Sequence, residues 1–186
     1  MLLLTIFIIL TIMKNIILKN GKNLNIRKLE ANDENVMQNF FLQIGNETTF
    51  TNNYPNQPLK NATKLVAAWQ NERDLYLGAF DNQIPVGLIL LNISKPEHPW
   101  LHHIGSFGVM ILKDYQGQGL GKILMQEMLD FANTQHLHRI EGEVRAPNVQ
   151  ALSLYEKFGF AVEGKKMHAA LINGEWIDNY LIAKLI

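Results

Sequence analysis

The order of strand-like and helix-like segments predicts an α/β domain in which helices flank a central mixed sheet. Three observations support this fold class. Apolar patterns of period two and period 3.6 follow one another in the order β-α-α-β-β-β-α-β-α-β-β. A glycine-rich turn, residues 117–121, joins a strand-like run to a helix-like run. Asn173-Gly174 joins the last two strand-like runs, and this dipeptide is typical of a β-hairpin turn.

Composition limits the function classes. The chain has 186 residues, which suits one domain with a sizeable core. Seventeen basic and seventeen acidic residues balance, so no global field attracts nucleic acid or an anionic membrane. The chain has no cysteine, which excludes a disulfide framework and a thiol nucleophile and is compatible with a cytoplasmic location.

Residues 1–13 form an almost wholly apolar extension. The run is shorter than the roughly 20 residues that a membrane-spanning helix needs. It also lacks the basic start and the small-residue cleavage site of a signal peptide. We therefore expect Met13 to be the natural start and residues 14–186 to form a single domain, with a membrane anchor as the alternative.

The first half of the chain predicts two helices and four strands. They are a strand over 24–29, helices over 33–44 and 62–71, and strands over 74–80, 86–93 and 100–112. Asn32 or Asp33 is placed to cap the first helix, and Gly45 to end it. Residues 46–60 are polar and irregular, which fits a functional loop or an ordinary solvated connection.

The second half predicts two helices and three strands. They are a helix over 120–135, a strand over 138–145, a helix over 148–159, and strands over 160–171 and 175–186. The first of these helices has an apolar and a polar face. Asn148 is placed to cap the second helix, and Gly159 to end it.

The glycine turn is placed to bind an anion. The first N–H groups of a helix lack intrahelical partners, and the helix dipole adds partial positive charge there. A dinucleotide fingerprint would need a third glycine where Lys122 or Leu124 stands. A P-loop would need glycine in place of Gln116 and Ser or Thr in place of Ile123. These two nucleotide-binding motifs are therefore excluded.

Two linked motifs carry a family resemblance. The first is Gln116-x-x-Gly119-x-Gly121, and the second is N-x-x-A-x-x-L-Y-x-K-x-G-F over residues 148–160. Together they resemble the pyrophosphate-binding turn and the following signature of the GCN5-related N-acetyltransferase (GNAT) superfamily. The resemblance covers about 24–186, and its tail is similar to the branch of amino-acid, phosphinothricin and ribosomal-protein N-terminal acetyltransferases.

The resemblance implies a GNAT fold, with a mixed, mostly antiparallel twisted sheet that has two splayed parallel strands and about four flanking helices. It implies acetyl-CoA as acetyl donor, with the pantetheine arm between the strands of residues 109–111 and 140–145. The implied binding residues are Val109, Met110, Ile111, Gln116, Gly117, Gln118, Gly119, Leu120, Gly121, Lys122 and Asn148. No metal is expected, because the six histidines show no metal-ligand spacing.

The implied reaction is direct attack of a primary amine on the thioester carbonyl. In the family, the tyrosine that matches Tyr155 protonates the leaving thiolate; a core aromatic is the alternative. Glu143 matches a glutamate that acts as base in the ribosomal-protein acetyltransferases. Glu141 on the same strand face, or a water molecule, could take that role instead. Arg145 could steer an acidic group of the substrate or pair with a glutamate.

The acceptor stays open among a small molecule, an amino acid and a peptide N-terminus. Residues that could line its site, or equally be packing or surface residues, are Glu47, Phe50, Tyr54 and Trp176, with His102 or His103 as a minor alternative. A homodimer through the closing strands is compatible with the resemblance. The alternative function is a non-catalytic acyl-CoA-binding module, which intact Asn148 and Tyr155 disfavour.

Overall fold

A computed structural model describes residues 13–58, 62–93, 95 and 97–186. The strands are β1 (Met13–Ile17), β2 (Asn23–Lys28), β3 (Leu75–Asp81), β4 (Ile84–Ile93), β5 (Ile104–Ile111), β6 (Arg139–Arg145), β7 (Ala161–Ile172) and β8 (Glu175–Leu185). The helices are α2 (Glu34–Glu47), α3 (Ala62–Trp69), α4 (Leu120–Thr134) and α5 (Val149–Lys157), with the 3-10 turns η1 (Ala31–Asp33) and η2 (Lys113–Tyr115). None of the helices in this described part is long and apolar enough to cross a membrane.

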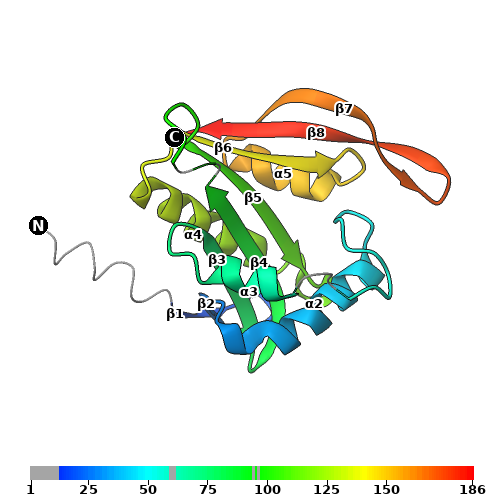
Figure 1. The fold of residues 1–186 in the computed structure, drawn as a ribbon. Coiled ribbons are helices and arrows are strands. Elements are labelled where there is room, and N and C mark those ends of the chain that lie inside the picture. Colours follow the sequence, from blue (N-terminus) through cyan, green and yellow to red (C-terminus); the bar gives the residue numbers. More distant parts are fainter. Residues whose placement is uncertain (1–12, 59–61, 94, 96) are drawn as a thin grey trace, which may run out of the picture.

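All eight strands form one sheet in the order β1-β2-β3-β4-β5-β6-β8-β7 (Figure 1). Neighbouring strands run antiparallel except β5 and β6, which are parallel. The predicted fold class, a mostly antiparallel mixed sheet flanked by helices, is therefore confirmed. The interpretation of residues 1–12 lies outside the described residues.

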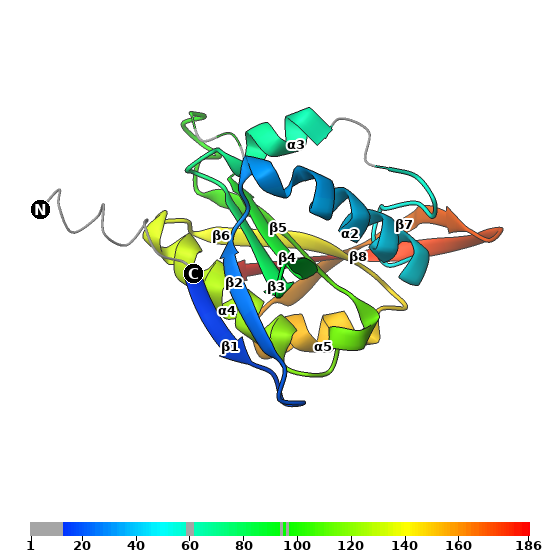
Figure 2. The same cartoon turned by 90° about the horizontal axis from the view of Figure 1, so that it is seen from below.

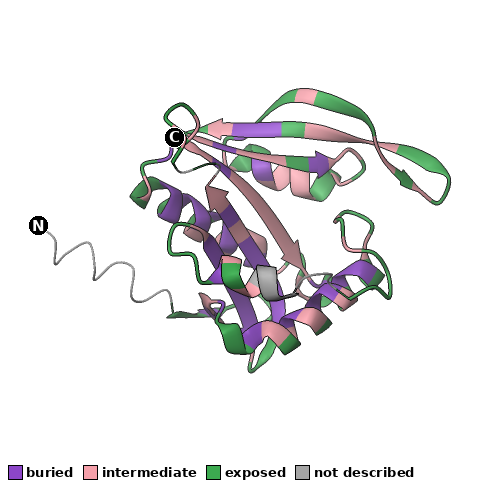
Figure 3. Ribbon diagram, viewed as in Figure 1, coloured by how far each residue is buried: buried purple, intermediate pink, exposed green. Residues whose placement is uncertain are grey.

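Helices cover both faces of the sheet. α2 and α3 lie on one face, and α4 and α5 lie on the other (Figure 2). Between these layers, β3 and β4 are apolar along most of their length and most of their residues are buried (Figure 3). Strands buried on both faces show such continuous apolar runs because neither face meets water. This core supports β5, the next strand in the sheet.

β5 and β6 separate from each other along their length. Their parallel register covers only Ile104–Ser106 opposite Arg139–Glu141. Beyond it, β5 stays paired with β4 as far as Ile111, while β6 stays paired with β8 as far as Arg145. The outer partners therefore hold the two strands apart, and their facing edges have no strand partner within the described sheet. The prediction of two splayed parallel strands is confirmed.

The edge strand β1 was missed by sequence reasoning. It pairs with β2 from Met13 opposite Arg27 to Ile17 opposite Asn23. Only Ile16 of its five residues is buried, so the sequence shows no alternation that would indicate a strand. Met13, which we assigned to the apolar extension, is the first residue of this strand.

Two predicted boundaries differ for local reasons. α2 continues through Gly45 to Glu47. A Cβ at Gly45 would lie 2.9 Å from the carbonyl oxygen of Tyr54, so this glycine allows the next loop to approach instead of ending the helix. The strand predicted from Trp100 begins only at Ile104, because the residues before it form turns.

Candidate functional site

The glycine turn lies between β5 and α4. Gly117 has a φ of +71° and Gly119 a φ of +96°, a region that favours glycine. A Cβ at either position would meet no atom within 4 Å, so the space outside the turn is open. Gly119 is the N-cap of α4, and no described side chain caps this helix end. The N–H groups of the first turn are thus available to an anion.

The next three residues contribute in different ways. Leu120 is buried in the core, so only its backbone N–H can serve a ligand. A Cβ at Gly121 would lie 3.1 Å from Cδ2 of Leu154, so this glycine lets α4 pack closely against α5. Lys122 is exposed, and its ammonium adds positive charge beside the turn.

Gln116 and Gln118 both contact other parts of the chain. Nε2 of Gln116 donates to the carbonyl oxygen of Ile111 at 2.9 Å, which links the end of β5 to the turn. The carbonyl oxygen of Gln118 accepts a hydrogen bond from the N–H of Lys19 at 3.3 Å. The structure therefore gives the Gln116 side chain a bracing contact, and its contact with a ligand stays a prediction.

Val109, Met110 and Ile111 are the last three residues of β5 and lie beyond its parallel pairing with β6. Ile111 faces α4 and α5, and Val109 shares that face by strand alternation. Met110 points to the other face, where Nδ2 of Asn53 lies 3.3 Å from its sulfur. The edge of this segment that faces β6 has no strand partner among the described residues, so its backbone groups suit an extended ligand.

An aromatic cluster fills the narrow end of the gap between the splayed strands β5 and β6, which we call the splay. It lies on the sheet face that α4 and α5 cover. Phe107 of β5 packs edge to face on Tyr155 of α5, with ring centroids 5.2 Å apart, and its ring centroid lies 5.0 Å from that of Phe160. A Cβ at Gly142 of β6 would lie 2.8 Å from Cε1 of Phe107. The Phe107 ring therefore occupies the gap just beyond the last parallel pair. Sequence reasoning missed this residue, for which Gly142 inside a strand was the available signal.

Tyr155 is a buried phenol, with 7% of its surface exposed. Burial raises its pKa to about 12, so the hydroxyl is protonated near neutral pH and can act as a proton donor. Seven residues earlier, Oδ1 of Asn148 accepts a hydrogen bond from the N–H of Ala151 at 3.2 Å, which confirms the predicted helix cap. This contact leaves the amide NH₂ of Asn148 as a donor on nearly the same helix face as Tyr155.

Glu143 lies on the opposite face of the sheet from Tyr155. Its carboxylate accepts hydrogen bonds from Nδ2 of Asn179 at 2.8 Å and from Nζ of Lys166 at 3.2 Å. These contacts, the Asn179 hydrogen bond first, lower the pKa of Glu143. The group therefore carries a negative charge near neutral pH and is a weak proton acceptor.

Glu141 differs from Glu143 in its place along the splay. It lies opposite Ser106, inside the paired part of β5 and β6. Nε of Arg139 donates to Glu141 at 2.9 Å, and the same guanidinium binds Glu163 of β7. Glu143 lies beyond the last parallel pair and is therefore the carboxylate beside the open part of the splay.

The loop after α2 is attached to both splayed strands. Nη2 of Arg145, the last residue of β6, donates to the carbonyl oxygen of Thr51 and to Oδ1 of Asn52, both at 3.1 Å. Asn53 reaches Met110 of β5. These contacts place the loop at the open end of the splay and favour the functional interpretation of this segment.

A small recess of about 140 Å³ lies where this loop meets the β7–β8 hairpin. Its lining residues are Thr49, Phe50, Arg145, Pro147, Ile172, Asn173, Glu175 and Ile177. Nε of Arg145 is buried and has no hydrogen-bond partner among the described residues. The recess thus combines apolar side chains with the charged side chains of Arg145 and Glu175.

Of the four residues predicted for the acceptor site, Phe50 lines this recess and the other three do not. Glu47 accepts a hydrogen bond from the first N–H of η2 at 2.8 Å. Tyr54 is exposed. Trp176 stacks on His168 with ring centroids 5.2 Å apart, and strand alternation places it on the face opposite to the recess.

His102 and His103 precede β5, at the end of that strand far from the glycine turn. They lie in a turn and not in the strand predicted over 100–112. Within the described ranges, no group of three or more His, Asp or Glu side chains is arranged to hold a metal ion.

Comparison with known proteins identifies related chains. A family model described as the acetyltransferase (GNAT) family matches residues 28–160. The L-amino acid N-acetyltransferase AaaT of Escherichia coli K12 is 33% identical over 96 residues, which cover 51% of this chain and 59% of that enzyme. The chain thus spans less than two thirds of the length of these curated relatives.

Two solved structures share the fold. An acetyltransferase of the GNAT family from Streptococcus pneumoniae has a TM-score of 0.80 and 30% identity, over 88% of this chain and 99% of that one. YncA of Salmonella typhimurium, solved with its cofactor acetyl-CoA, has a TM-score of 0.74 and 16% identity, over 87% of this chain and 93% of that one. At 16% identity, the second likeness shows the fold alone.

Proposed function

Because the chain belongs to the GNAT family of acetyltransferases, we propose that it is an acetyl-CoA-dependent N-acetyltransferase acting on a primary amine. The predicted family is confirmed. The observation that carries the proposed activity is the splay between β5 and β6, with the glycine turn at its wide end and Tyr155 at its narrow end. This arrangement offers an anion site, a slot for an extended arm and a proton donor, in that order.

The residues present fit acetyl-CoA as the donor. The open space outside Gly117 and Gly119 suits a pyrophosphate, with the first N–H groups of α4 and the Lys122 ammonium beside it. The free edge of residues 109–111 suits the amides of a pantetheine arm. The amide of Asn148 adds a donor from the start of α5. When bound, acetyl-CoA would supply the thioester whose acetyl group passes to the amine.

Tyr155 and Glu143 would act from opposite faces of the sheet. The Tyr155 hydroxyl would give its proton to the departing sulfur, since burial keeps this group protonated. A backbone N–H near Val109 or Met110 would stabilise the charge that develops on the carbonyl oxygen. Glu143 would attract the acceptor ammonium through its negative charge. A water molecule would then remove the proton of the ammonium, because a lowered pKa makes Glu143 a poor base. Direct base catalysis by Glu143 is the alternative.

For the acceptor we propose an L-amino acid. The recess at the open end of the splay is lined by Arg145, whose guanidinium charge suits an α-carboxylate. The similarity to AaaT, which is named for L-amino acids, supports the same class. A peptide N-terminus is the alternative, because it would place an amide carbonyl where a free amino acid places its carboxylate.

Thiol release from acetyl-CoA, measured over L-amino acids, their carboxamides, polyamines and short peptides, tests both proposals. We expect turnover with L-amino acids, at a kcat/KM about tenfold or more above that of the matching carboxamides, because the amide lacks the charge that Arg145 would pair with. Turnover with peptides or carboxamides alone would overturn the acceptor class but not the activity. Tight acetyl-CoA binding without thiol release on any amine would favour a non-catalytic acyl-CoA-binding module.

Three further expectations stay proposals. A cytoplasmic location rests on composition, and the lack of a nucleic-acid partner rests on the balance of basic and acidic residues. A homodimer through β7 and β8 rests on the family resemblance. Sedimentation velocity at micromolar concentration would test the homodimer.

A further inference from the structure

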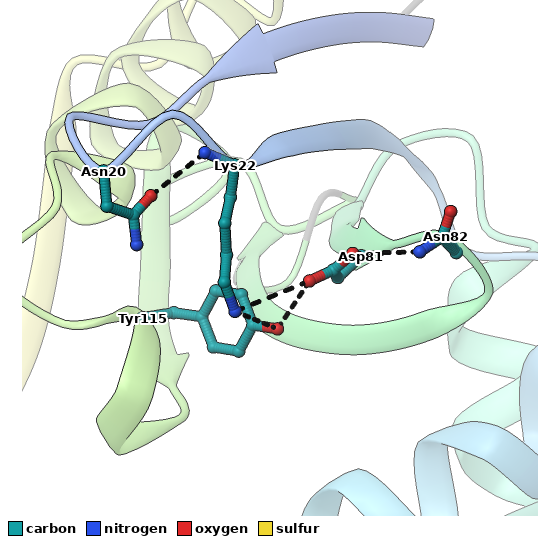
Figure 4. Close-up of polar contacts among 5 residues, drawn as sticks. All are labelled: Asn20, Lys22, Asp81, Asn82 and Tyr115. Atoms are coloured by element: carbon teal, nitrogen blue, oxygen red, sulfur yellow. Dashed lines mark hydrogen bonds and ion pairs between the residues drawn. The ribbon is translucent and has the colours of Figure 1, made fainter.

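Three side chains outside the slot form a cluster next to the glycine turn (Figure 4). Tyr115 is the last residue of η2 and directly precedes Gln116. Its hydroxyl donates to Oδ2 of Asp81 at 2.7 Å and accepts a hydrogen bond from Nζ of Lys22 at 3.2 Å. Nζ of Lys22 also lies 3.8 Å from Oδ2 of Asp81 and 4.3 Å from the centre of the Tyr115 ring. The cluster therefore joins the end of β3, the β1–β2 connection and the connection before α4.

The same corner of the molecule makes a second contact with the turn. The N–H of Lys19, in the β1–β2 connection, donates to the carbonyl oxygen of Gln118 at 3.3 Å. Oδ1 of Asn20 accepts the N–H of Lys22 at 3.1 Å, which shapes this connection (Figure 4). The β1–β2 connection thus touches the β5–α4 connection on both sides of Gln116.

The first part of the turn needs such support because its glycines have no side chains to anchor it. Gly117 and Gly119 both have positive φ, and neither has a side chain that could pack against the core. Glycine loses more backbone freedom on ordering than any other residue. A turn that is already ordered binds an anion better than one that orders only on binding, because the ligand does not have to supply that free energy.

Global stability is a weak explanation for this cluster. Lys22 is exposed, and exposed ion pairs contribute little to folding. Asp81 is held on its other oxygen as well, since Nδ2 of Asn82 donates to Oδ1 at 3.1 Å (Figure 4). The carboxylate is therefore oriented toward Tyr115, which points to a geometric purpose.

We infer that Lys22, Tyr115 and Asp81 are positioning residues that hold the glycine turn in the shape that receives the pyrophosphate of acetyl-CoA. This inference rests on the proposed function. None of the three touches the reacting atoms. Their effect is confined to donors that carry a pyrophosphate, and it leaves the chemistry at Tyr155 unchanged.

The test compares two donors in Tyr115→Phe. Acetyl-CoA carries the pyrophosphate, and S-acetylpantetheine has the same thioester without it. We expect the Kd of acetyl-CoA to rise about three- to tenfold, the range for one lost hydrogen bond. We also expect kcat at saturating acetyl-CoA and kcat/KM for S-acetylpantetheine to stay within about twofold of wild type, since neither depends on the turn.

Tyr76→Phe is the matched control. The Tyr76 hydroxyl donates to Oδ1 of Asn92 at 2.6 Å, so this variant also loses one tyrosine hydrogen bond but lies on β3 and β4 away from the turn. Its acetyl-CoA affinity should equal that of wild type. Lys22→Gln should weaken the binding of acetyl-CoA in the same selective way. Lys22→Arg should bind acetyl-CoA like wild type, because arginine can still donate to the Tyr115 hydroxyl.

The outcomes separate this inference from the proposed function. If wild type fails to bind acetyl-CoA, both are overturned. If wild type binds and turns over but Tyr115→Phe binds acetyl-CoA normally, the positioning role alone is overturned. An equal fall in acetyl-CoA affinity and in kcat/KM for S-acetylpantetheine would also overturn the positioning role. An equal fall in acetyl-CoA affinity in Tyr76→Phe would do the same, because both results would indicate general destabilisation. A melting temperature is recorded for each variant so that unfolding is not read as weak binding.

Discussion

Phe107 and Tyr155 meet edge to face, with ring centroids 5.2 Å apart, on the α4–α5 side of the splay between β5 and β6. This contact joins the strand proposed to hold the acetyl donor to the helix that carries the proposed proton donor. Glu143 lies on the other face, beyond the last parallel pair of the two strands. Tyr155 would therefore act on the leaving group from one face and Glu143 on the attacking amine from the other. Each role can be tested by a separate mutation.

Tyr155→Phe keeps the aromatic contact with Phe107 and removes only the hydroxyl. We expect kcat to fall about 100-fold, the lower end for loss of a general acid, while the Kd of acetyl-CoA stays within about twofold. Steady-state kinetics and calorimetric titration measure the two quantities. An unchanged kcat would remove Tyr155 from the mechanism.

The raised pKa of Tyr155 leads us to expect a stability that depends on pH. Burial raises the pKa of Tyr155 from 10.0 to about 12, so the folded state holds this proton more tightly than the unfolded chain. Its contribution is fully present below pH 10 and is lost as the pH rises through 12, a loss of about 2–3 kcal/mol in the free energy of unfolding. Urea unfolding between pH 8 and 12 should show this component in wild type and not in Tyr155→Phe. An identical alkaline loss in both proteins would contradict it.

Glu143→Gln tests the proposed attraction of the acceptor ammonium. We expect kcat/KM for the amine to fall about tenfold, the scale of one hydrogen bond to a charged group, with acetyl-CoA affinity unchanged. Glu141→Gln is the control, because Glu141 lies in the paired part of the strands beside Arg139, and it should change kcat/KM less than about twofold.

The pH profile separates the two roles left open for Glu143. Because its pKa is lowered, Glu143 is charged throughout the neutral range, and the acid limb of kcat/KM should follow the amine of the acceptor. The midpoint of that limb should therefore be the same in Glu143→Gln. A limb that disappears in the variant would instead make Glu143 the base.

Gly119→Val tests the anion site. Gly119 has a φ of +96° and open space beyond its Cα, so a valine there strains the backbone and enters the space assigned to the pyrophosphate. Gly174 in the β7–β8 turn has a φ of +86° and equally open space, which makes Gly174→Val a matched control. Both variants should lose about 1–3 kcal/mol of stability. Acetyl-CoA affinity should fall at least about tenfold in Gly119→Val alone, and normal binding by that variant would refute our placement of the site.

The elements with strong local signals were predictable from the sequence. Asn173-Gly174 forms the hairpin turn with φ values of +53° and +86°, which this dipeptide tolerates better than others. Asn148 caps α5, because a short side-chain oxygen before a helix satisfies one of its free N–H groups. The splayed pair was predicted from the motifs that follow each of the two strands, through the family resemblance, and not from periodicity.

What the sequence could not show depends on contacts between distant segments. Arg145 binds the carbonyl oxygen of Thr51 across 94 positions, and Lys22 binds Tyr115 across 93. Neither pair has a local pattern, because each forms only after the strands are in register. The recess is hidden for the same reason, since its walls come from a loop, the end of β6 and a hairpin. β1 was missed because an edge strand needs few buried residues.

Amide hydrogen exchange with and without saturating acetyl-CoA tests whether the splay between β5 and β6 is the donor site, because it reports where the donor binds without requiring an acceptor. We predict slower exchange at residues 109–111 of β5 and at the glycine turn, residues 117–121. We predict no change in the β7–β8 hairpin, which would meet only the amine. Slower exchange elsewhere, with both of these segments unchanged in a protein that binds acetyl-CoA, would show that the splay between β5 and β6 is not the donor site.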